Sequence, residues 1–564
     1  MKFHDFNYER PDMDLLKGQF KSLLKEFSEA PTAEQQSAKL SEINSLRNRF
    51  TTLSNIVEVR HTIDTNDAKY LDEQNFIDNV RPEFEELVTE YYEVLINSKY
   101  RNELKNAFGK QLFDFAEESI KSFKPEIMEE LKSQNQLCTQ YNQLVAAAEI
   151  DFEGEKRNLA ALGPYELSTD RNMRKKATDA KFGYFASHEK EFDANYDQLV
   201  KLRDQMAHKL NFDNYVQLGY SRMVRTEYDA AKVALFRDEI RRVVTPLVQK
   251  LKDKQAKRLG LDKLTYYDEG LLFKSGNAKP KGDGAWIVAN AKKMYGELSN
   301  ETNEFFTFML SQNLMDLENK KGKASGGYCT MFPDYKAPFI FSNFNGTSHD
   351  IDVLTHEAGH AFQCYESRNF NVAEYFFPTY EACEIHSMSM EFLTWPWMNL
   401  FFEEDTDKYK YAHLLKCLYF LPYGCTVDEF QHVIYENPNL TPTERKKVWL
   451  EIENKYSPGK DYDDNEYLKN GGYWQRQQHI YNSPFYYIDY VLAQICAFQF
   501  WHKANVDRKS AWTDYVNLCR QGGSLPFLQL VKAANLKSPF DQGCVEQAIE
   551  PIAKWIDAID DTKF

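Results

Sequence analysis

The residues best suited to chemistry in this chain are two histidines and a glutamate in the segment Thr355-His356-Glu357-Ala358-Gly359-His360, an H-E-x-x-H pattern. On a helix, residues four apart share a face, so His356 and His360 can direct two imidazole rings at one metal ion. Glu357 lies on the same turn, where it can hold a water molecule at the metal and take its proton. Histidine is scarce (12 of 564 residues), so composition alone would produce such a match in about one chain in fifty. The surrounding sequence must therefore supply a helix, a third ligand and donors for an oxyanion.

A third ligand is needed because a catalytic zinc ion normally has three protein ligands and one open position. The acidic candidates that follow the pattern are Glu366, Glu374, Glu381, Glu384 and Glu391. Residues 380–393 predict a helix on which Glu384 and Glu391, seven residues apart, share one face. Either residue could bind the metal, and the other could then orient a histidine ring or the ligand carboxylate.

Two further histidines near the pattern are not expected to bind the metal. His386 follows Glu384 by two residues, which directs it to a different face of the helix. His349 lies two turns before His356, too far along the helix axis to share the ion. We expect His349 to be a capping or surface residue.

The elements before the pattern predict how its helix is positioned. Residues 328–331 and 338–344 are typical of two short strands around a turn at Pro333-Asp334-Tyr335. Gly346-Thr347-Ser348 is expected to end the second strand and to cap the helix. Gly359 costs that helix some stability, but it allows another backbone to approach closely.

The strand at 339–344 has two interpretations. As an edge strand beside the metal, it could pair its free backbone groups with an extended peptide of any sequence. As the internal strand of a hairpin, it would have no free backbone groups to offer. The sequence leaves both interpretations open.

Most of the remaining chain predicts helices. From Asp12 to about Phe108, apolar residues recur at three-and-four spacing, and Pro31 and Pro82 are expected to punctuate the helices. Residues 146–162 are typical of a short hairpin or a helix-breaking loop around Glu153-Gly154. We expect a scaffold role for the N-terminal helices.

Composition excludes several classes of function. The net charge of −16 argues against a nucleic-acid partner, because phosphate binding needs clustered cations. No run of about 18 apolar residues is present to span a bilayer, and the N-terminus lacks the apolar core of a secretory signal. Nine cysteines without a C-x-x-C pair are typical of reduced thiols. A cytoplasmic protein is therefore expected, and its length of 564 residues predicts two or three lobes or one large helical body.

Taken together, the motifs resemble a known family. H-E-A-G-H at 356–360, followed by E-I-H-S-M-S-M-E-F at 384–392, is similar to the zinc metallopeptidases of the thimet oligopeptidase and oligoendopeptidase F group. The chain most resembles the oligoendopeptidase F and Pz-peptidase branch, and residues 159–174 and the tyrosine-rich C-terminal segment extend the likeness. In the family, the first glutamate of the E-x-x-S-x-x-x-E pattern is a metal ligand. The resemblance therefore implies that Glu384 binds the metal and that Glu391 orients a ligand.

The resemblance also implies the cofactor and the catalytic residues. One Zn²⁺ per chain would be held by His356, His360 and Glu384, with Glu357 as the general base. The metal-bound water would attack the scissile carbonyl, and Glu357 would then pass the proton to the leaving amine.

In the family, a histidine and tyrosines of the C-terminal segment bind the substrate carbonyl, a role that falls here on His479, Tyr486 and Tyr490. Pro484 favours a helix start, after which Tyr486 and Tyr490 share a face. The spacing from His479 to the tyrosines differs from that in thimet oligopeptidase. Two neighbouring tyrosines are therefore alternatives to Tyr486, namely Tyr481 and Tyr487.

We expect a mainly α fold: a large two-lobed helical metallopeptidase with a deep substrate channel, implied by the resemblance, and a small β element beside the active-site helix. The expected domains are an N-terminal helical region (1–110), an oligoendopeptidase F-type N-terminal domain (111–200) and a zinc-peptidase catalytic domain (201–564). The expected activity is that of a zinc-dependent oligoendopeptidase, which hydrolyses internal bonds of short unfolded peptides. Two alternatives are a helical zinc carboxypeptidase and a non-catalytic peptide-binding protein. The sequence leaves the oligomeric state open.

Overall fold

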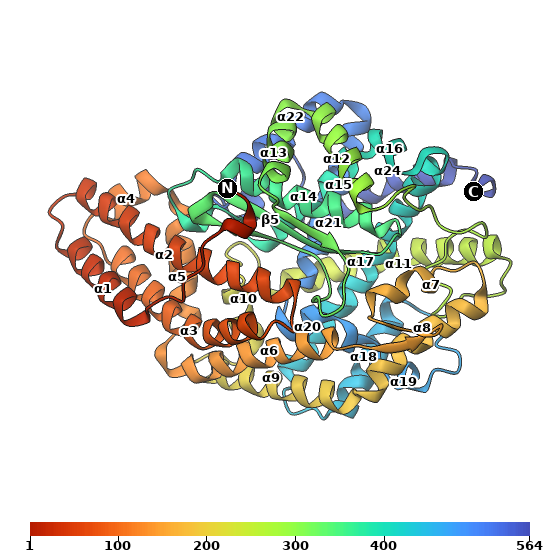
Figure 1. Cartoon of the computed structure of the whole chain (residues 1–564), viewed down its shortest axis with the longest axis horizontal. Coiled ribbons are helices and arrows are strands. Elements are labelled where there is room, and N and C mark those ends of the chain that lie inside the picture. The colour runs from red at the N-terminus through yellow and green to blue at the C-terminus, as the bar shows by residue number, and fades with distance from the viewer.

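The N-terminal helices form one end of the molecule, drawn in red and orange in Figure 1. The structure, a computed structural model, describes all 564 residues. These helices are α1 (Met13–Glu29), α2 (Ala33–Ile63), α3 (Ala68–Ile96), α4 (Arg101–Phe108) and α5 (Lys110–Ser122). They bury a core of their own, a cluster of 20 residues that includes Phe20, Phe50 and Tyr91. Val372 and Tyr375, from a distant part of the sequence, also belong to this core, so the N-terminal helices are attached to the rest by packing.

Pro82 does not punctuate the helices as the sequence predicted, because it lies inside α3. Proline removes the hydrogen bond that its nitrogen would donate to the carbonyl four residues earlier. That carbonyl belongs to Asp78, and it accepts instead from Nδ2 of Asn135 at 3.3 Å. A side chain from a neighbouring helix therefore compensates for the bond that Pro82 removes.

The remaining helices surround a larger core of 112 buried residues. From residue 128 to 311 they are α6 (Met128–Ala146), α7 (Gly163–Glu166), α8 (Arg171–Ser187), α9 (Glu189–Lys209), α10 (Tyr215–Arg222), α11 (Ala230–Leu259), α12 (Gly284–Leu298) and α13 (Asn300–Ser311). From residue 349 onward they are α14 (His349–Ser367), α15 (Tyr380–Leu393), α16 (Asn399–Phe402), α17 (Thr406–Glu436), α18 (Pro442–Tyr456), α19 (Glu466–Lys469), α20 (Gln478–Asn482), α21 (Tyr487–Val506), α22 (Arg508–Gln521), α23 (Phe527–Ala533) and α24 (Cys544–Ala558). The mainly α class predicted from sequence is confirmed. The three-domain division stays a prediction.

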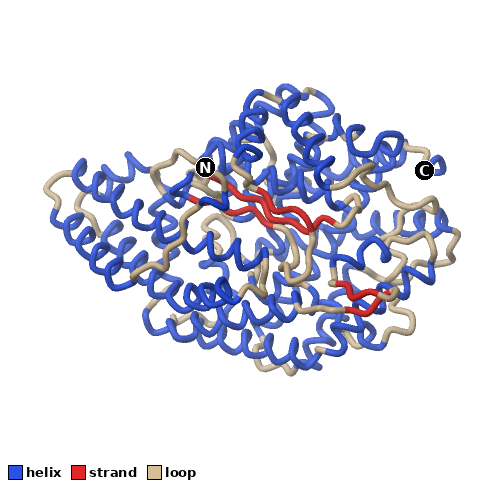
Figure 2. The backbone as a smooth tube through the Cα atoms, viewed as in Figure 1, coloured by secondary structure: helices blue, strands red, loops and turns tan.

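Strands are few and occur in two places, as Figure 2 shows. A hairpin pairs β1 (Ile150–Phe152) with β2 (Glu155–Arg157), which is one of the two structures expected for that segment. A three-stranded sheet contains β3 (Met315–Glu318), β4 (Tyr328–Phe332) and β5 (Ala337–Phe344). Its order is β3-β5-β4, with β5 parallel to β3 and antiparallel to β4.

The central position of β5 decides between the two interpretations of residues 339–344. Its backbone pairs with β3 on one side, where Met315 lies opposite Ile340, and with β4 on the other, where Thr330 lies opposite Phe339. The edge-strand interpretation of this segment is therefore wrong. The two edge strands of the sheet are β3 and β4. The sequence did not indicate β3, because its four residues are too few to show a pattern.

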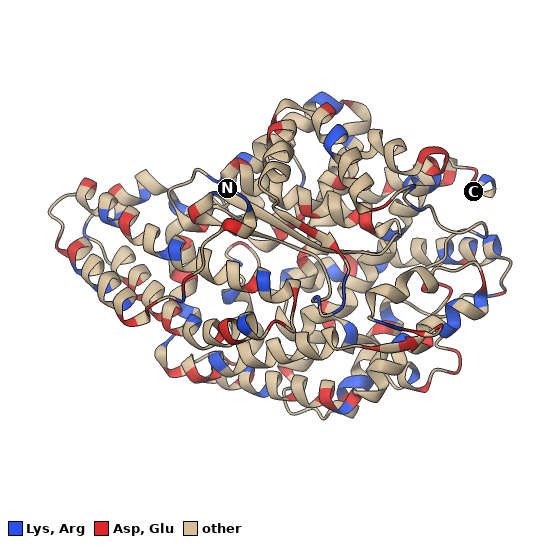
Figure 3. Ribbon diagram, in the orientation of Figure 1, with Lys and Arg blue, Asp and Glu red and all other residues tan.

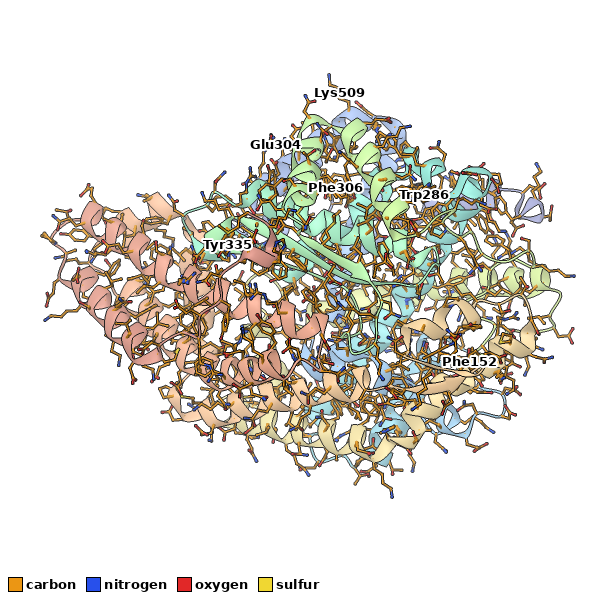
Figure 4. All side chains as sticks on the ribbon, in the orientation of Figure 1. Phe152, Trp286, Glu304, Phe306, Tyr335 and Lys509 are labelled. Carbon is orange, nitrogen blue, oxygen red and sulfur yellow. The ribbon has the colours of Figure 1, made fainter.

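The N-terminal segment closes over the turn between β4 and β5. The ring of Phe6 stacks on that of Tyr335 with centroids 3.7 Å apart, and Tyr335 is labelled beside this segment in Figure 4. Acidic and basic residues are interspersed along the ribbon in Figure 3. None of the helices has an apolar stretch of the length that crossing a bilayer requires.

Candidate active site

The helix α14 carries the H-E-x-x-H pattern and begins directly after the sheet. The Asp350 carboxylate accepts from the backbone N–H groups of Asn345 and Gly346 at 2.9 and 2.8 Å, and so ties the first turn to the preceding loop. Ser348 occupies the cap position, but its side chain makes no capping hydrogen bond. The side-chain cap that the sequence predicted for this segment is therefore not formed, and the contact of Asp350 with the preceding loop holds the helix start in place instead.

Gly359 allows α14 and α15 to pack backbone against backbone. A Cβ atom at this position would lie 2.6 Å from the carbonyl oxygen of His386 and 2.6 Å from the Cα of Ser387. Real Cβ atoms do not approach other atoms so closely, so only glycine fits. The close approach predicted from the sequence is confirmed, and it brings the third candidate ligand up to the histidine pair.

Three candidate ligand atoms converge between these two helices. Oε2 of Glu384 lies 3.1 Å from Nε2 of His356 and 3.3 Å from Nε2 of His360. All three atoms are within 4.8 Å of one another. Glu384 is fully buried. Although burial opposes its ionisation, the two imidazoles hold the pKa of Glu384 well below its ordinary value.

The other groups around Glu384 fix its orientation. Oγ of Ser387 donates to Oε2 at 2.8 Å. The hydroxyl of Tyr486 donates to Oε1, the oxygen that does not face the imidazoles. With both oxygens engaged, this carboxylate is held at the histidine pair.

Glu391 hydrogen-bonds His356 and connects it to a buried series of hydrogen-bonded side chains. Its Oε1 is 2.7 Å from Nδ1 of His356, and its Oε2 is 2.7 Å from Nε2 of His413. The indole N–H of Trp395 donates to Nδ1 of His413 at 2.9 Å. Because an indole can only donate, Nδ1 of His413 accepts, and its Nε2 carries the hydrogen that is given to Glu391. The same carboxylate accepts from Nδ1 of His356, which leaves the Nε2 lone pair of His356 facing the other candidate ligands.

Glu357 lies beside the candidate ligands and has a free oxygen. The residue is 6% exposed, and its Oε2 atom is buried without a hydrogen-bond partner. Burial raises the pKa of Glu357. An unpaired buried carboxylate oxygen is costly, so this group is set to receive a proton or a hydrogen bond from a ligand.

His479 and Tyr490 form a hydrogen bond whose direction is fixed by their neighbours. The hydroxyl of Tyr423 donates to Oε1 of Gln477 at 2.8 Å, which orients the amide so that its Nε2 donates to Nδ1 of His479 at 2.9 Å. Nε2 of His479 then carries the ring hydrogen and donates to the hydroxyl of Tyr490 at 3.2 Å. Burial lowers the pKa of His479 to about 4. The hydroxyl hydrogen of Tyr490 is thereby left free for another acceptor.

These groups line one cavity of about 750 Å³, a size typical of ligand sites. Its residues include the three candidate ligands, Glu357, His479, Tyr486 and Tyr490. Ser325 to Met331, from β4 and the loop before it, also line the cavity. Of the alternatives to Tyr486, Tyr481 is fully buried and stacks on Tyr141. Tyr487 is not among the lining residues either.

The remaining acids and histidines near the pattern are engaged elsewhere. Glu366 pairs with Arg520, Glu374 with Arg47, and Glu381 accepts from the hydroxyl of Tyr228. His386 is completely buried on a different face of α15, as its spacing predicted. His349 is exposed at the first turn of α14.

Three residues of this site were not found from sequence, namely Trp395, His413 and Gln477. His413 comes from α17, 22 residues after Glu391 and 57 after His356, with no periodic pattern to connect them. Only the packing of α17 against the other helices brings it to Glu391. No local signal could have identified it.

The chain is similar to known peptidases. The N-terminal domain of peptidase M3 matches residues 3–123, and peptidase family M3 matches residues 291–549. A structure of Pz peptidase A with an inhibitor is 56% identical, has a TM-score of 0.99, and aligns over 100% of both chains. A Bacillus anthracis protein assigned as an oligoendopeptidase F is 52% identical with a TM-score of 0.94, over 100% of this chain and 99% of that one.

A sequence relative is more distant. The oligoendopeptidase F homolog of Borreliella burgdorferi is 27% identical over 226 residues, which are 38% of this chain and 37% of that protein. The match thus spans little more than a third of that relative.

Proposed function

The chain belongs to peptidase family M3, and we propose that it is a zinc-dependent oligoendopeptidase that hydrolyses internal bonds of short peptides. The observation that carries the proposal is the convergence of His356, His360 and Glu384 beside the unpaired oxygen of Glu357. The nine cysteines are all free thiols, which supports peptide turnover in the reducing cytoplasm.

The donor set fits zinc. Two imidazole nitrogens and one carboxylate oxygen form the ligand set of many zinc hydrolases, which keep a fourth position open. When bound, zinc supplies Lewis-acid activation of the attacking water and of the scissile carbonyl. The hydrogen bond from His356 to Glu391 supports this set, because such a bond orients the ring and raises its basicity as a ligand.

Glu357 is the proposed general base. It accepts the proton of the attacking water as the new carbon–oxygen bond forms, and it delivers that proton to the nitrogen as the carbon–nitrogen bond breaks. Its raised pKa supports both steps, because a carboxyl group with a pKa nearer neutrality exchanges protons more readily at the operating pH.

Tyr490 is the proposed oxyanion donor. Its hydroxyl accepts from neutral His479, so its own hydrogen is available to the developing negative charge. Burial keeps the pKa of this phenol well above 10, so it remains a donor at neutral pH. Tyr486 lies beside Tyr490, but its single hydroxyl hydrogen is donated to Glu384 in this structure, so its proposed role here is to hold the ligand carboxylate.

The free edge of β4 is the proposed docking strand for the peptide main chain. Gly327 at its start lies near Oε1 of Glu357, and β4 continues along the cavity to Met331. Main-chain pairing recognises peptides without regard to sequence, which suits a general oligopeptidase.

An internally quenched peptide blocked at both ends tests the proposal. We expect cleavage that a chelator abolishes and zinc restores, with no cleavage by Glu357→Gln. Cleavage that requires a free C-terminus would instead support the carboxypeptidase alternative. Binding without turnover at any metal content would support a peptide-binding protein.

A further inference from the structure

A second cavity, of about 350 Å³, adjoins the one lined by His356, His360 and Glu384 and extends toward the N-terminal helices. The two cavities share four lining residues, which are Thr51, Phe115, Arg222 and Ala373. A peptide that lies along β4 toward Met331 therefore approaches the residues that border this second space. We call it the arginine pocket, because three of its lining residues are Arg47, Arg81 and Arg222.

The arginine pocket has more positive than negative charge of its own. Arg47 is satisfied, since its Nη2 lies 2.6 Å from Oε1 of Glu374 and its Nη1 donates to Asn44. Neither Arg81 nor Arg222 lies within 4.0 Å of any carboxylate, and the single acid that lines the pocket, Glu85, has no basic partner within that distance either. Two guanidinium groups thus face one carboxylate, in a chain whose net charge is −16.

Arg222 has the strongest need for a partner. Its Nη1 atom is buried and has no hydrogen-bond acceptor, and it stands at the end of α10 where the two cavities meet. A buried charged donor without an acceptor is unfavourable, and a carboxylate that reaches it relieves this cost, because the two form charge-assisted, often bidentate hydrogen bonds.

We propose that the arginine pocket binds a carboxylate of the peptide substrate, with Arg222 as the residue that contacts it. This inference rests on the proposed peptidase function and adds a substrate class to it. The carboxylate is either the C-terminal one or that of an Asp or Glu side chain. Both sources offer the same planar, singly charged acceptor, and they differ only in where the peptide carries it.

Matched peptide pairs measure the effect and separate the two sources. One pair differs only in a free or amidated C-terminus, and a second series replaces Gln by Glu at each position on either side of the cleaved bond. In the wild-type enzyme we expect one pair to show at least a tenfold lower KM for the acidic member. Arg222→Gln should reduce that acid-to-neutral ratio to near one, and Arg222→Lys should restore part of it.

The control variant is Arg49→Gln, which removes an arginine of α2 that pairs with Asp334 and lines neither cavity. It should keep the wild-type ratio. A wild-type ratio near one for every pair, or an unchanged ratio in a folded Arg222→Gln protein, overturns the proposal. Failure of the peptidase function itself is recognised separately, because no peptide is then cleaved. In that event the same pairs are compared by their Kd values, and an acid-to-neutral ratio near one for every pair overturns the proposal.

Discussion

The cavity at the candidate metal ligands and the adjoining arginine pocket differ in how their polar groups are held. Around α14 and α15, nearly every group has a fixed partner: Glu384 is held by Ser387 and Tyr486, and Glu391 by two histidines. At the end formed by α3 and α10, Arg81 and Arg222 have no ion-pair partner. Prearranged groups reduce the reorganisation that a reaction requires, whereas unpaired charges gain most from a ligand. The comparison suggests that one end performs chemistry and the other recognises substrate.

Among variants at the candidate metal ligands, Glu357→Gln should have the largest effect. We expect kcat to fall about 10³-fold or more, because the amide cannot accept the proton, while the bound zinc content stays the same. Glu366→Gln is the matched control, since Glu366 is also on α14 but pairs with Arg520 on the exterior. Metal analysis and steady-state kinetics check both variants. Substantial turnover by a zinc-loaded Glu357→Gln enzyme would exclude this residue as the base.

Tyr490→Phe should have the next largest effect. Removing one oxyanion donor lowers kcat by about 10²- to 10³-fold and changes KM little, because the interaction strengthens only as negative charge develops. Tyr487→Phe removes the neighbouring hydroxyl, which does not line the cavity, and should leave kcat close to wild type. Equal losses in the two variants would count against a specific role for Tyr490.

The fixed network can be broken at its outer end through His413. His413→Leu leaves the second oxygen of Glu391 without its donor, so we expect zinc to bind about 10- to 100-fold more weakly. His413→Gln keeps an N–H group near Oε2 and should recover much of the affinity. Competition with a chromophoric chelator measures both. Tyr409→Phe, which removes a hydrogen bond from another residue of α17 to Asp352 of α14, should bind zinc normally.

The smallest expected effect is on stability in acid. Burial lowers the pKa of His479 to about 4, whereas an unfolded histidine titrates near 6.5. Between these values the unfolded state binds the extra proton, so stability present above pH 6.5 is lost as the pH falls, by at most about 1.4 kcal/mol per pH unit. His479→Phe should reduce the slope of the free energy of unfolding between pH 6.5 and 4.5. An identical slope would mean that His479 is already solvated.

The sequence predicted best where neighbouring residues carry the information. The histidine pair is a one-turn pattern, and residues 328–331 and 338–344 were recognised as strands because they flank a proline-containing turn. It predicted less well where distant segments decide the outcome. Pro82 is tolerated because Asn135 supplies a hydrogen bond from another helix. Strand β5 is internal because β3, which the sequence did not indicate, pairs with its second side.

Gly359 has a consequence for what may occupy the two unspecified positions of the histidine pattern. In this chain the second of them, Gly359, is in contact with the main chain of α15, so its missing side chain sets the distance between Glu384 and the two imidazoles. Even a methyl group there would wedge the helices apart and lengthen the reach from Glu384 to both imidazoles. The geometry that the three candidate ligands present to a metal therefore depends on the absence of a side chain at position 359.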